Sequence, residues 1–389
     1  MNNYFAFNDN VILVKGYKRA LIQDLIKGRI FSINEDSKII LEQLLQGKSI
    51  NEVVNNEKRI TGFYGKEKEL TKKIDTAWLE LRRACNLNCC HCYLDCNIDG
   101  DKNLELMTID NWEKVIIQLK ALKVKTIILI GGEPLLFREI NELLKYCKET
   151  IPKVTLVLYS NLTLLNKNHV KAIKETNTKV ITSIYSKDPK VHDSITGVNG
   201  SFYKTVNSVK LLTNEEIFVK ANTVLMNKNE YNIEETLQFT YELTGVKSKI
   251  DKVRDVGQSK ISLSPINKID TNFNIKGIKE NEFLRNYSGN SCLQGKINIC
   301  CNGDVTPCIM GDTFKSLDLN VKNNSIMEIV QKYLIPQFWR LSKDKIEKCK
   351  DCEYRYVCKD CRPTAVNKKN ICNYNPYKGE YENIKPSMN

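Results

Sequence analysis

The chain has 389 residues, of which 42% are hydrophobic and 27% charged, a composition typical of globular proteins with two or three domains. It contains no run of about eighteen uncharged apolar residues and begins without a basic segment followed by an apolar core, so neither a membrane span nor a signal peptide is predicted. The formal net charge of +13 favours acidic partners, but no nucleic-acid motif accompanies it. We therefore expect a cytoplasmic protein, in which so many cysteines as the fifteen found here indicate metal binding rather than disulfides.

The N-terminal region begins with three short apolar segments that are rich in β-forming residues and separated by turn residues. These predicted strands are 10–15, 19–25 and 28–33. An amphipathic helix is predicted at 34–47, and a second short helix at 49–58. Strands followed by such helices predict a small winged-helix-like domain over residues 1–72.

Residues 73–245 alternate between strand-like and helix-like segments. The predicted strands are 77–85, 126–136, 153–161, 179–186 and 217–226, and the predicted helices are 107–122, 139–149, 164–175 and 201–215. Regular alternation predicts an α/β fold with a parallel sheet covered by helices. Functional residues of such folds gather at the carboxyl ends of the strands, so we expect one composite site there. The residues at or near these ends are Cys85, Gly131, Asn161, Ser183 and Asn222.

The remainder of the chain divides into a bridging region, residues 246–290, and a cysteine-rich region, residues 291–389. The second of these holds nine of the fifteen cysteines among weak secondary-structure signals and many turns. A segment with so little apolar core needs metal to fold.

Five cysteines lie close together in the stretch 82–96, and three of them have the pattern Cys85-x3-Cys89-x2-Cys92. Three thiolates on one loop are able to hold three corners of a [4Fe–4S] cluster and leave the fourth iron open. A zinc ion would need a fourth ligand, and His91, directly beside Cys92, is poorly placed to supply it. Cys89 and Cys92 also have the spacing of a redox-active pair. The spacing alone leaves all three readings open.

A second motif, Gly131-Gly132-Glu133-Pro134, follows the next predicted strand, and its glycines would let a ligand approach the backbone closely. Cysteines after the first strand and Gly-Gly-Glu-Pro after the second resemble the radical S-adenosylmethionine (SAM) enzymes, over residues 76 to about 245. The resemblance implies a partial (β/α)6 TIM-like barrel. It also implies that the open iron chelates SAM and that the Gly-Gly-Glu segment contacts the methionyl amine.

The same resemblance implies SAM contacts from Ser183, Asn222 and Asn161, for which capping of strand ends is the alternative. His91 stands where the family usually has an aromatic residue, and we expect it to pack beside SAM. The stretch 188–212 is similar to peptide-acting members of the superfamily, and its His192 is expected to be structural.

The C-terminal cysteines resemble the SPASM domain, which holds two auxiliary [4Fe–4S] clusters. The resemblance implies outer-cluster ligands Cys349, Cys352, Cys358 and Cys372, and inner-cluster ligands Cys292, Cys308 and Cys361. A fourth inner ligand would be Cys301 or Cys300, which point to opposite faces if they lie on a strand. If neither binds, one iron is open to a substrate thiolate. Cys358-x2-Cys361 departs from the x3 usual in the family, and a pair of zinc ribbons is the alternative for the region.

The N-terminal segment 20–54 resembles the peptide-recognition domain of ribosomal-peptide modification systems. Such domains bind a leader peptide as an extra strand at a sheet edge. A capping domain without a ligand is the alternative. The C-terminal stretches "CEYRYVCKDC" and "CNYNPY" also resemble SPASM enzymes that modify ribosomal peptides.

These resemblances predict a radical SAM peptide maturase with three [4Fe–4S] clusters and SAM as cofactors. It would generate a 5′-deoxyadenosyl radical, abstract hydrogen from a precursor peptide and install a cross-link, with a cysteine thioether favoured. The expected partners are the precursor peptide with its leader and an electron donor such as flavodoxin or ferredoxin. No catalytic side chain is assigned, since hydrogen abstraction needs no protein acid or base.

Other reactions remain open at this point. They are a carbon–carbon or carbon–oxygen cross-link, epimerisation, and oxidation of the kind carried out by anaerobic sulfatase maturases. Outside the enzymes, an iron–sulfur redox or sensor protein is the alternative.

Overall fold

The computed structural model describes residues 6–48, 73–253, 257–258, 263, 278, 280–310, 319–358 and 374–381. The chain divides into two compact units, which are described separately below. Unit 1 comprises Met1–Thr71, Asp270–Gln294 and Leu334–Asn389, and unit 2 comprises Lys72–Ile269 and Gly295–Tyr333. The domain boundaries expected from the sequence remain predictions.

Unit 2 is built on an eight-stranded sheet with the order β11-β10-β4-β5-β6-β7-β8-β9. Strands β10 and β11 pair antiparallel, and the other neighbours pair parallel. The strands are β4 (Thr76–Glu80), β5 (Thr126–Ile130), β6 (Thr155–Tyr159), β7 (Lys179–Ser183), β8 (Val219–Leu225), β9 (Ile250–Lys252), β10 (Lys296–Ile299) and β11 (Val305–Thr306). The predicted α/β fold with a mostly parallel sheet is therefore confirmed.

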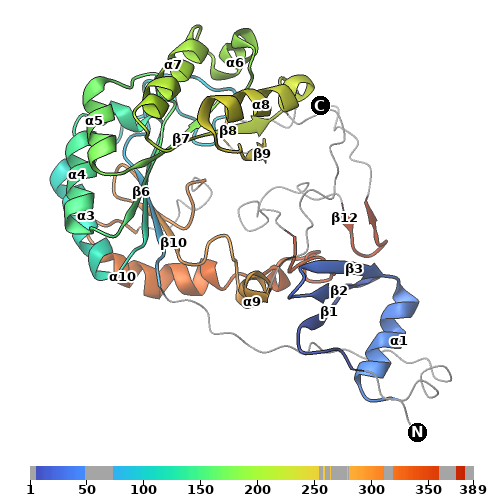
Figure 1. Ribbon diagram of the computed structural model, residues 1–389. Helices are drawn as coiled ribbons and strands as arrows, with labels where there is room; N and C mark the ends of the chain where they lie inside the picture. The colour runs from blue at the N-terminus through green and yellow to red at the C-terminus, as the bar shows by residue number, and fades with distance from the viewer. Residues whose placement is uncertain are drawn as a thin grey trace. The chain divides into compact units, whose positions relative to one another are not determined.

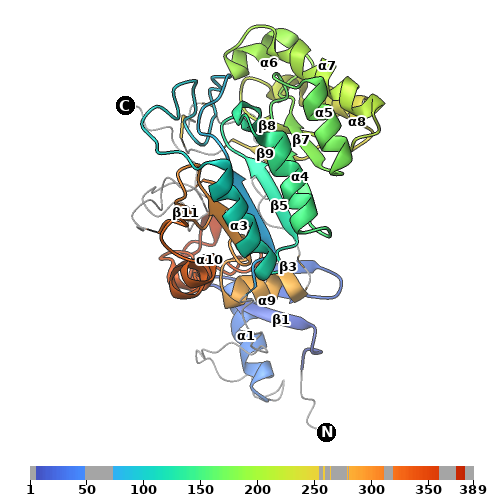
Figure 2. The ribbon, with the colours of Figure 1, turned by 90° about the vertical axis from the view of Figure 1, so that its left-hand side faces the viewer.

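Helices cover the outer face of this sheet, as Figure 1 shows for α3, α4 and α5. The helices of unit 2 are α3 (Ile109–Ala121), η1 (Pro134–Leu136), α4 (Ile140–Thr150), α5 (Lys167–Glu175), α6 (Pro189–Thr196), α7 (Ser201–Asn214), η2 (Glu230–Asn232), α8 (Ile233–Thr244) and α10 (Ile326–Ile329). Their starts follow ordinary capping rules, since Thr108 and Asn111 form a capping box at α3. In Figure 2 α3 and α4 lie along the sheet on the side facing the viewer.

The predicted segments correspond to β4–β8 and to α3, α4, α5 and α7. The sequence analysis did not predict α6, α8, β9, β10 or β11. Strand β10 lies in the cysteine-rich region and pairs parallel with β4, so the start of that region extends the barrel sheet. Its four residues are too few for a periodic pattern to separate it from irregular structure.

Unit 1 begins with an antiparallel sheet of the order β1-β2-β3, followed by helix α1. The bounds in this unit are β1 (Val11–Lys15), β2 (Ala20–Asp24), β3 (Arg29–Ile33), α1 (Glu35–Leu45), α9 (Glu280–Ser288), η7 (Lys343–Lys345), β12 (Tyr374–Asn375) and β13 (Glu380–Tyr381). Helix η6 (Val330–Trp339) contains the boundary between the two units. The three predicted strands and the first helix are confirmed. The second predicted helix, 49–58, lies outside the described residues, and the winged-helix assignment stays a prediction.

The N-terminal sheet shares its hydrophobic core with later parts of the chain. Its buried residues pack with α9 and with two residues of the cysteine-rich region. The members of this core are Ile12, Val14, Leu21, Leu25, Ile278, Phe283, Leu284, Tyr356 and Val357. Three strands of five residues expose too much apolar surface to be stable alone, which explains why the sheet needs these partners.

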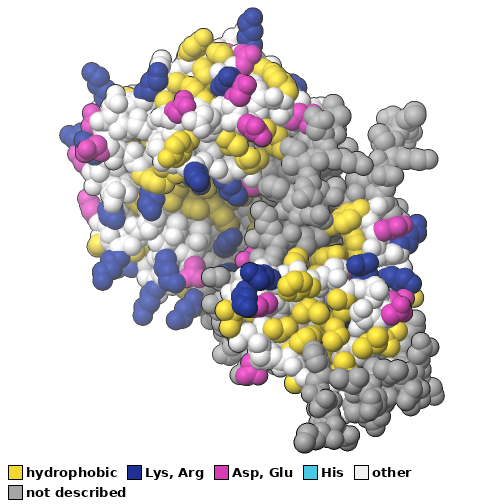
Figure 3. All heavy atoms as spheres, turned by 45° about the vertical axis from the view of Figure 1, so that its right-hand side comes forward, with side chains coloured by type: hydrophobic (Ala, Val, Ile, Leu, Met, Phe, Trp, Pro, Cys, Tyr) yellow, Lys and Arg dark blue, Asp and Glu magenta, His cyan; other side chains and the backbone are white. Residues whose placement is uncertain are grey.

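The surface of unit 1 carries exposed apolar side chains, and the lower part of Figure 3 shows hydrophobic atoms gathered on this unit. Exposed large side chains near its sheet include Ile26 in the turn between β2 and β3, Phe31 on β3 and Ile40 on α1. Among the helices in the described part of the chain, none is long and apolar enough to cross a membrane.

Candidate active site

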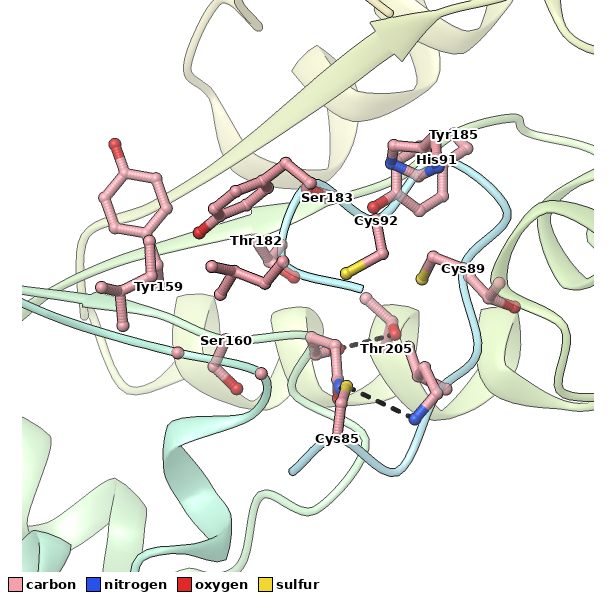
Figure 4. Close-up of a pocket in the computed structure, with 18 of the residues that line it drawn as sticks. Cys85, Cys89, His91, Cys92, Tyr159, Ser160, Thr182, Ser183, Tyr185 and Thr205 are labelled. Carbon is pink, nitrogen blue, oxygen red and sulfur yellow. Dashed lines mark hydrogen bonds between the residues drawn. The ribbon is translucent and has the colours of Figure 1, made fainter. Parts of the chain in front are cut away.

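A cavity opens where strands β5, β6 and β7 end and the loop after β4 begins. Figure 4 shows its lining, with the sulfur atoms of Cys89 and Cys92 side by side and that of Cys85 below them in this view. The lining also includes Gly131, Gly132, Asn161 and Ser183, so the fold brings together residues from four separate segments. The composite site expected at the strand ends is therefore present as an arrangement of side chains.

Backbone hydrogen bonds hold the loop that carries the three cysteines. The amide of Cys85 donates to the carbonyl of Asn97 at 2.9 Å. The amides of Asn88 and Cys90 donate to Thr196 (2.9 Å) and Ile195 (3.0 Å), at the carboxyl end of α6. Helix α6, which the sequence analysis missed, thus fixes the middle of the cysteine loop.

The Gly-Gly-Glu segment runs beside the start of the same loop. The amide of Gly132 donates to Arg82 O at 2.7 Å, and the amide of Glu133 donates to Ala84 O at 2.9 Å. Gly131 has φ +154°, and a Cβ atom there would lie 2.2 Å from Arg82 O. Glycine is required because the two backbones approach too closely for a side chain.

The side chain of Glu133 is held in place by hydrogen bonds from neighbouring residues. Its carboxylate accepts hydrogen bonds from Leu135 N (2.9 Å), Ser160 Oγ (2.7 Å) and Asn161 N (2.8 Å). Burial raises the pKa of Glu133 to about 7, although these donors favour the charged form. Neither Glu133 nor Pro134 is among the residues that line the cavity. Their assigned role in SAM binding therefore remains a prediction, and the side chain of Glu133 ties β5 to the end of β6.

The three thiols differ in their surroundings. Cys92 accepts hydrogen bonds from the Cys96 thiol and from neighbouring backbone amides, including Cys96 N at 3.4 Å, and these lower its pKa to about 6. Burial raises the pKa of the Cys85 thiol to about 11, and its sulfur accepts from Leu87 N at 3.4 Å. Burial also raises the pKa of Cys89. The loop thus stabilises a thiolate most strongly at Cys92.

The other three residues predicted to contact SAM do not all line the cavity. Asn161 lines the cavity, and its amide donates to Asn86 Oδ1 at 3.0 Å and to Cys85 Sγ at 3.9 Å. Ser183 also lines the cavity. Asn222 pairs with Ser183 across β7 and β8 but does not line the cavity, and its side-chain oxygen accepts from Lys249 N at 3.1 Å. The structure therefore brings two of these three residues to the thiols.

Several lining residues were not predicted from the sequence. Tyr185 packs edge-on against His91, with 4.7 Å between ring centroids, and lies tilted against His192, with 5.4 Å between ring centroids. His192 is buried and accepts a hydrogen bond from Tyr185 N at 3.3 Å, as befits a structural residue. Thr182 and Thr205 complete this side of the cavity. Their spacing carries no motif, so only the fold could reveal them.

The donor set and the polar lining fit an iron–sulfur cluster with a polar ligand. Thr182 Oγ1 and His91 Nδ1 are buried in the lining without a hydrogen-bond partner among the residues that the structure describes, and such atoms are normally satisfied. In the described part of the chain, no three His, Cys, Asp or Glu side chains converge on the position of a single metal ion. Thiolates that each bind a different iron of one cluster do not need to converge in this way.

The C-terminal cysteines fall in both units, and each group is described within its own unit. In unit 2, Cys301 Sγ donates to Glu80 Oε1 at 3.9 Å, whereas Cys300 Sγ accepts from Asn298 Nδ2 at 3.5 Å. The two neighbours thus have different partners, as expected for side chains on opposite faces. Cys308 also belongs to unit 2, and the predicted ligands of unit 1 within the described residues are Cys292, Cys349, Cys352 and Cys358.

The remaining predicted ligands, Cys361 and Cys372, lie outside the described residues. No disulfide bond joins cysteines among the residues that the structure describes. The ligand assignments of this region stay predictions.

Comparison with family models identifies both cysteine regions. Residues 79–240 match the radical SAM superfamily, and residues 291–353 match the SPASM iron-sulfur cluster-binding domain. The matched ranges contain the Cys85–Cys92 loop and the start of the C-terminal cysteine set.

Several curated relatives match most of the chain. One is the antilisterial bacteriocin subtilosin biosynthesis protein AlbA of Bacillus subtilis, 26% identical over 85% of this chain and 78% of that protein. Another is the AdoMet-dependent heme synthase of Methanosarcina barkeri, 25% identical over 78% of this chain and 97% of that protein. Among solved structures, Streptococcus suis SuiB bound to precursor peptide SuiA has a TM-score of 0.61 at 14% identity, over 94% of this chain and 97% of SuiB. At that identity the likeness shows the fold.

Proposed function

This chain is a radical SAM enzyme with a SPASM domain, and from that premise we propose that it modifies a ribosomally made precursor peptide. The observation that carries the proposal is the combination of the thiol-lined cavity with an N-terminal sheet that has an exposed apolar edge strand. The similarity to a bacteriocin biosynthesis protein over most of both chains supports the same substrate class.

Cys85, Cys89 and Cys92 are the proposed ligands of the first [4Fe–4S] cluster. When bound there, the cluster supplies the electron that cleaves SAM to methionine and a 5′-deoxyadenosyl radical. Asn161 and Ser183, with the unsatisfied Thr182 Oγ1 and His91 Nδ1, offer polar contacts to SAM. The surrounding aromatic and apolar side chains exclude water from the reacting groups.

Strand β3 is the proposed site of leader binding. It is one of the two edge strands of the described sheet, β1 being the other, and Phe31 on β3 is 54% exposed. An edge strand offers backbone groups to which an extended peptide adds as a further strand, and exposed apolar side chains give the added strand contacts. The similar fold of a protein bound to its precursor peptide is consistent with this substrate class.

We extend the proposal to the number of clusters and to the product. We assign two auxiliary clusters to the C-terminal set, which makes three clusters in total, and a thioether between a cysteine and an unactivated carbon as the product. An auxiliary cluster offers an acceptor for the surplus electron and a holder for the substrate thiolate. A flavodoxin or ferredoxin is the proposed electron donor.

The first test is anaerobic reconstitution of the full chain, followed by iron and sulfide analysis and addition of dithionite and SAM. Three clusters predict about twelve irons per chain, and the reaction predicts 5′-deoxyadenosine by mass spectrometry. Zinc in place of iron, without SAM cleavage, would overturn the assignment of the cavity.

The second test concerns the substrate. Short reading frames beside the gene supply candidate peptides, and each is incubated with the reconstituted enzyme and SAM. A mass loss of two hydrogens, with one cysteine no longer alkylated, identifies a thioether. The same loss with all thiols intact identifies a carbon–carbon or carbon–oxygen link, and an unchanged mass with altered stereochemistry identifies epimerisation. Turnover of a tetrapyrrole instead of any peptide would place the chain with its heme-synthase relative.

A further inference from the structure

The N-terminal sheet is built directly onto the loop Cys349–Cys358, called the outer cysteine loop below. The turn between β1 and β2 packs on this loop within unit 1. Tyr17 N donates to Asp351 O at 2.6 Å, and the Tyr17 ring lies edge-on to Tyr377, whose hydroxyl donates to Asp351 Oδ2 at 2.9 Å. A Cβ at Gly16 would lie 2.5 Å from Glu353 N, so the two backbones are in close contact.

Arg355 joins the two segments through one guanidinium group. Its Nη1 donates to Lys15 O, at the end of β1, at 2.5 Å and to Cys352 O at 2.9 Å. Its Nε donates to Asp344 Oδ1 at 2.8 Å. A carbonyl of the first strand and a carbonyl beside a predicted cluster ligand are therefore held by the same side chain.

The outer cysteine loop also reaches the edge strand. The Tyr354 hydroxyl lies 3.3 Å from Ser32 Oγ on β3. Tyr356 and Val357 enter the core that contains Val14 and Leu21 of the sheet. The loop therefore contacts the turn, the buried face and the edge strand of the sheet.

The loop has little structure of its own to hold these contacts in place. Within it, Cys352 N donates to Cys349 O at 3.0 Å and Cys358 N donates to Tyr354 O at 2.8 Å, bonds of consecutive turns. Three thiols within ten residues of such turns are a donor set for iron rather than a hydrophobic core. Segments of this kind gain their folding free energy from the metal.

We propose that iron binding at the outer cysteine loop fixes the N-terminal sheet, so that β1 and β2, the strands on which the edge strand β3 is built, are formed only in the iron-loaded chain. The reason is geometric, since the sheet, the turn and the loop share one core and one set of backbone hydrogen bonds. This inference rests on the proposed function of β3. It means that a chain without its outer iron does not bind its precursor peptide. The precursor peptide then binds only to a chain that holds its outer iron and is able to complete the reaction.

Hydrogen exchange measured by mass spectrometry tests this without any peptide. The full chain is compared in reconstituted and chelator-treated forms, together with Cys352→Ser. Amides of 11–24 are expected to exchange at least about tenfold faster without iron or in Cys352→Ser, while amides of β5–β7 keep their protection. Iron added back restores protection in the wild type alone.

Matched variants separate this coupling from general damage. Cys89→Ser, in the other cysteine loop, is expected to leave exchange at 11–24 unchanged. Arg355→Ala is expected to speed it with iron retained, and Arg340→Ala, at an exposed arginine of the same unit, is not. Unchanged exchange at 11–24 in the iron-free chain overturns the proposal, and so does an equal rise in β5–β7. Failure to modify any peptide would overturn the proposed function and leave this result intact.

Discussion

The two cysteine loops of this chain are supported in different ways. The loop with Cys85, Cys89 and Cys92 follows a strand of a parallel sheet. Core residues of that sheet, such as Leu79 and Leu129, are completely buried. The outer cysteine loop is itself part of a core, and the sheet beside it has only five-residue strands. The comparison teaches that one set of predicted ligands follows a sheet with its own buried core, whereas the other set shares one core with the small sheet beside it.

Removing the thiols of the barrel loop gives the largest expected effect. Replacing Cys85, Cys89 and Cys92 together with Ala is expected to abolish formation of 5′-deoxyadenosine, because no ligand for the first cluster remains. The C-terminal iron and the far-ultraviolet circular dichroism spectrum should be retained, since the sheet has its own core. SAM cleavage that survives would show that the cavity is not the SAM site.

Gly131→Ala tests the close backbone approach between the Gly-Gly-Glu segment and the start of the cysteine loop. The new Cβ would meet Arg82 O at 2.2 Å, and the φ of +154° is strained for alanine. We expect a loss of about 3 kcal/mol of unfolding free energy, measured by urea denaturation. Gly200→Ala is the control, because Gly200 also has positive φ but no atom within 4 Å, and it should cost about 1 kcal/mol. Equal costs would contradict the role of the close approach.

Glu133→Gln tests the connection between β5 and β6. The carboxylate accepts from three donors, whereas the amide nitrogen of glutamine cannot accept, so one buried donor loses its partner. We expect a loss of about 2 kcal/mol in unfolding free energy. Glu142→Gln, at an exposed position on α4, should change it by less than about 0.5 kcal/mol. If the two variants were equally stable, Glu133 would not hold the strands.

Val357→Ala tests the core of unit 1, which contains the outer cysteine loop. It removes two methyl groups from the core that the outer cysteine loop shares with the N-terminal sheet. We expect a loss of about 1.5 kcal/mol. Hydrogen exchange should become faster in β1 and β2, although the changed residue lies more than three hundred positions away. Val209→Ala, in helix α7 of the other unit, should leave those strands unchanged.

The smallest effect is a pH dependence of the barrel. Burial lowers the pKa of His192 to about 4, below its value of 6.5 in the unfolded chain. The unfolded chain therefore binds the extra proton first, so the stability contribution is complete above pH 6.5 and is lost as pH falls toward 4. Between pH 7.5 and 5.5 we expect His192 to contribute a loss of about 1 kcal/mol, measured as the difference between the wild type and His192→Asn, because the raised pKa of Glu133 acts in the opposite direction.

Urea denaturation of the wild type and His192→Asn at the two pH values measures this contribution. An equal pH dependence of the wild type and His192→Asn would contradict the burial of a neutral histidine.

Much of the cavity was predictable because its signals are local. The cysteine spacing, the Gly-Gly-Glu-Pro segment and the alternation of strands and helices lie within short windows, and Asn161 and Ser183 follow from their places at strand ends. Tyr185 and Thr182 were not predictable, since no motif marks them and only the folded sheet brings them to the cavity. Helix α6 is too short for periodicity to reveal, yet its end binds the cysteine loop.

The sequence by itself determined the chemistry of this protein: thiols at cluster spacing, a glycine pair after a buried strand, and apolar segments with the period of a parallel α/β sheet. The tertiary structure decided which residues meet. It placed Glu133 among backbone donors, kept Asn222 out of the cavity and joined the first strand to a loop near the other end of the chain. The physical reason is that ligand type and periodicity are local properties, whereas burial and hydrogen bonding between distant segments exist only after the chain has folded.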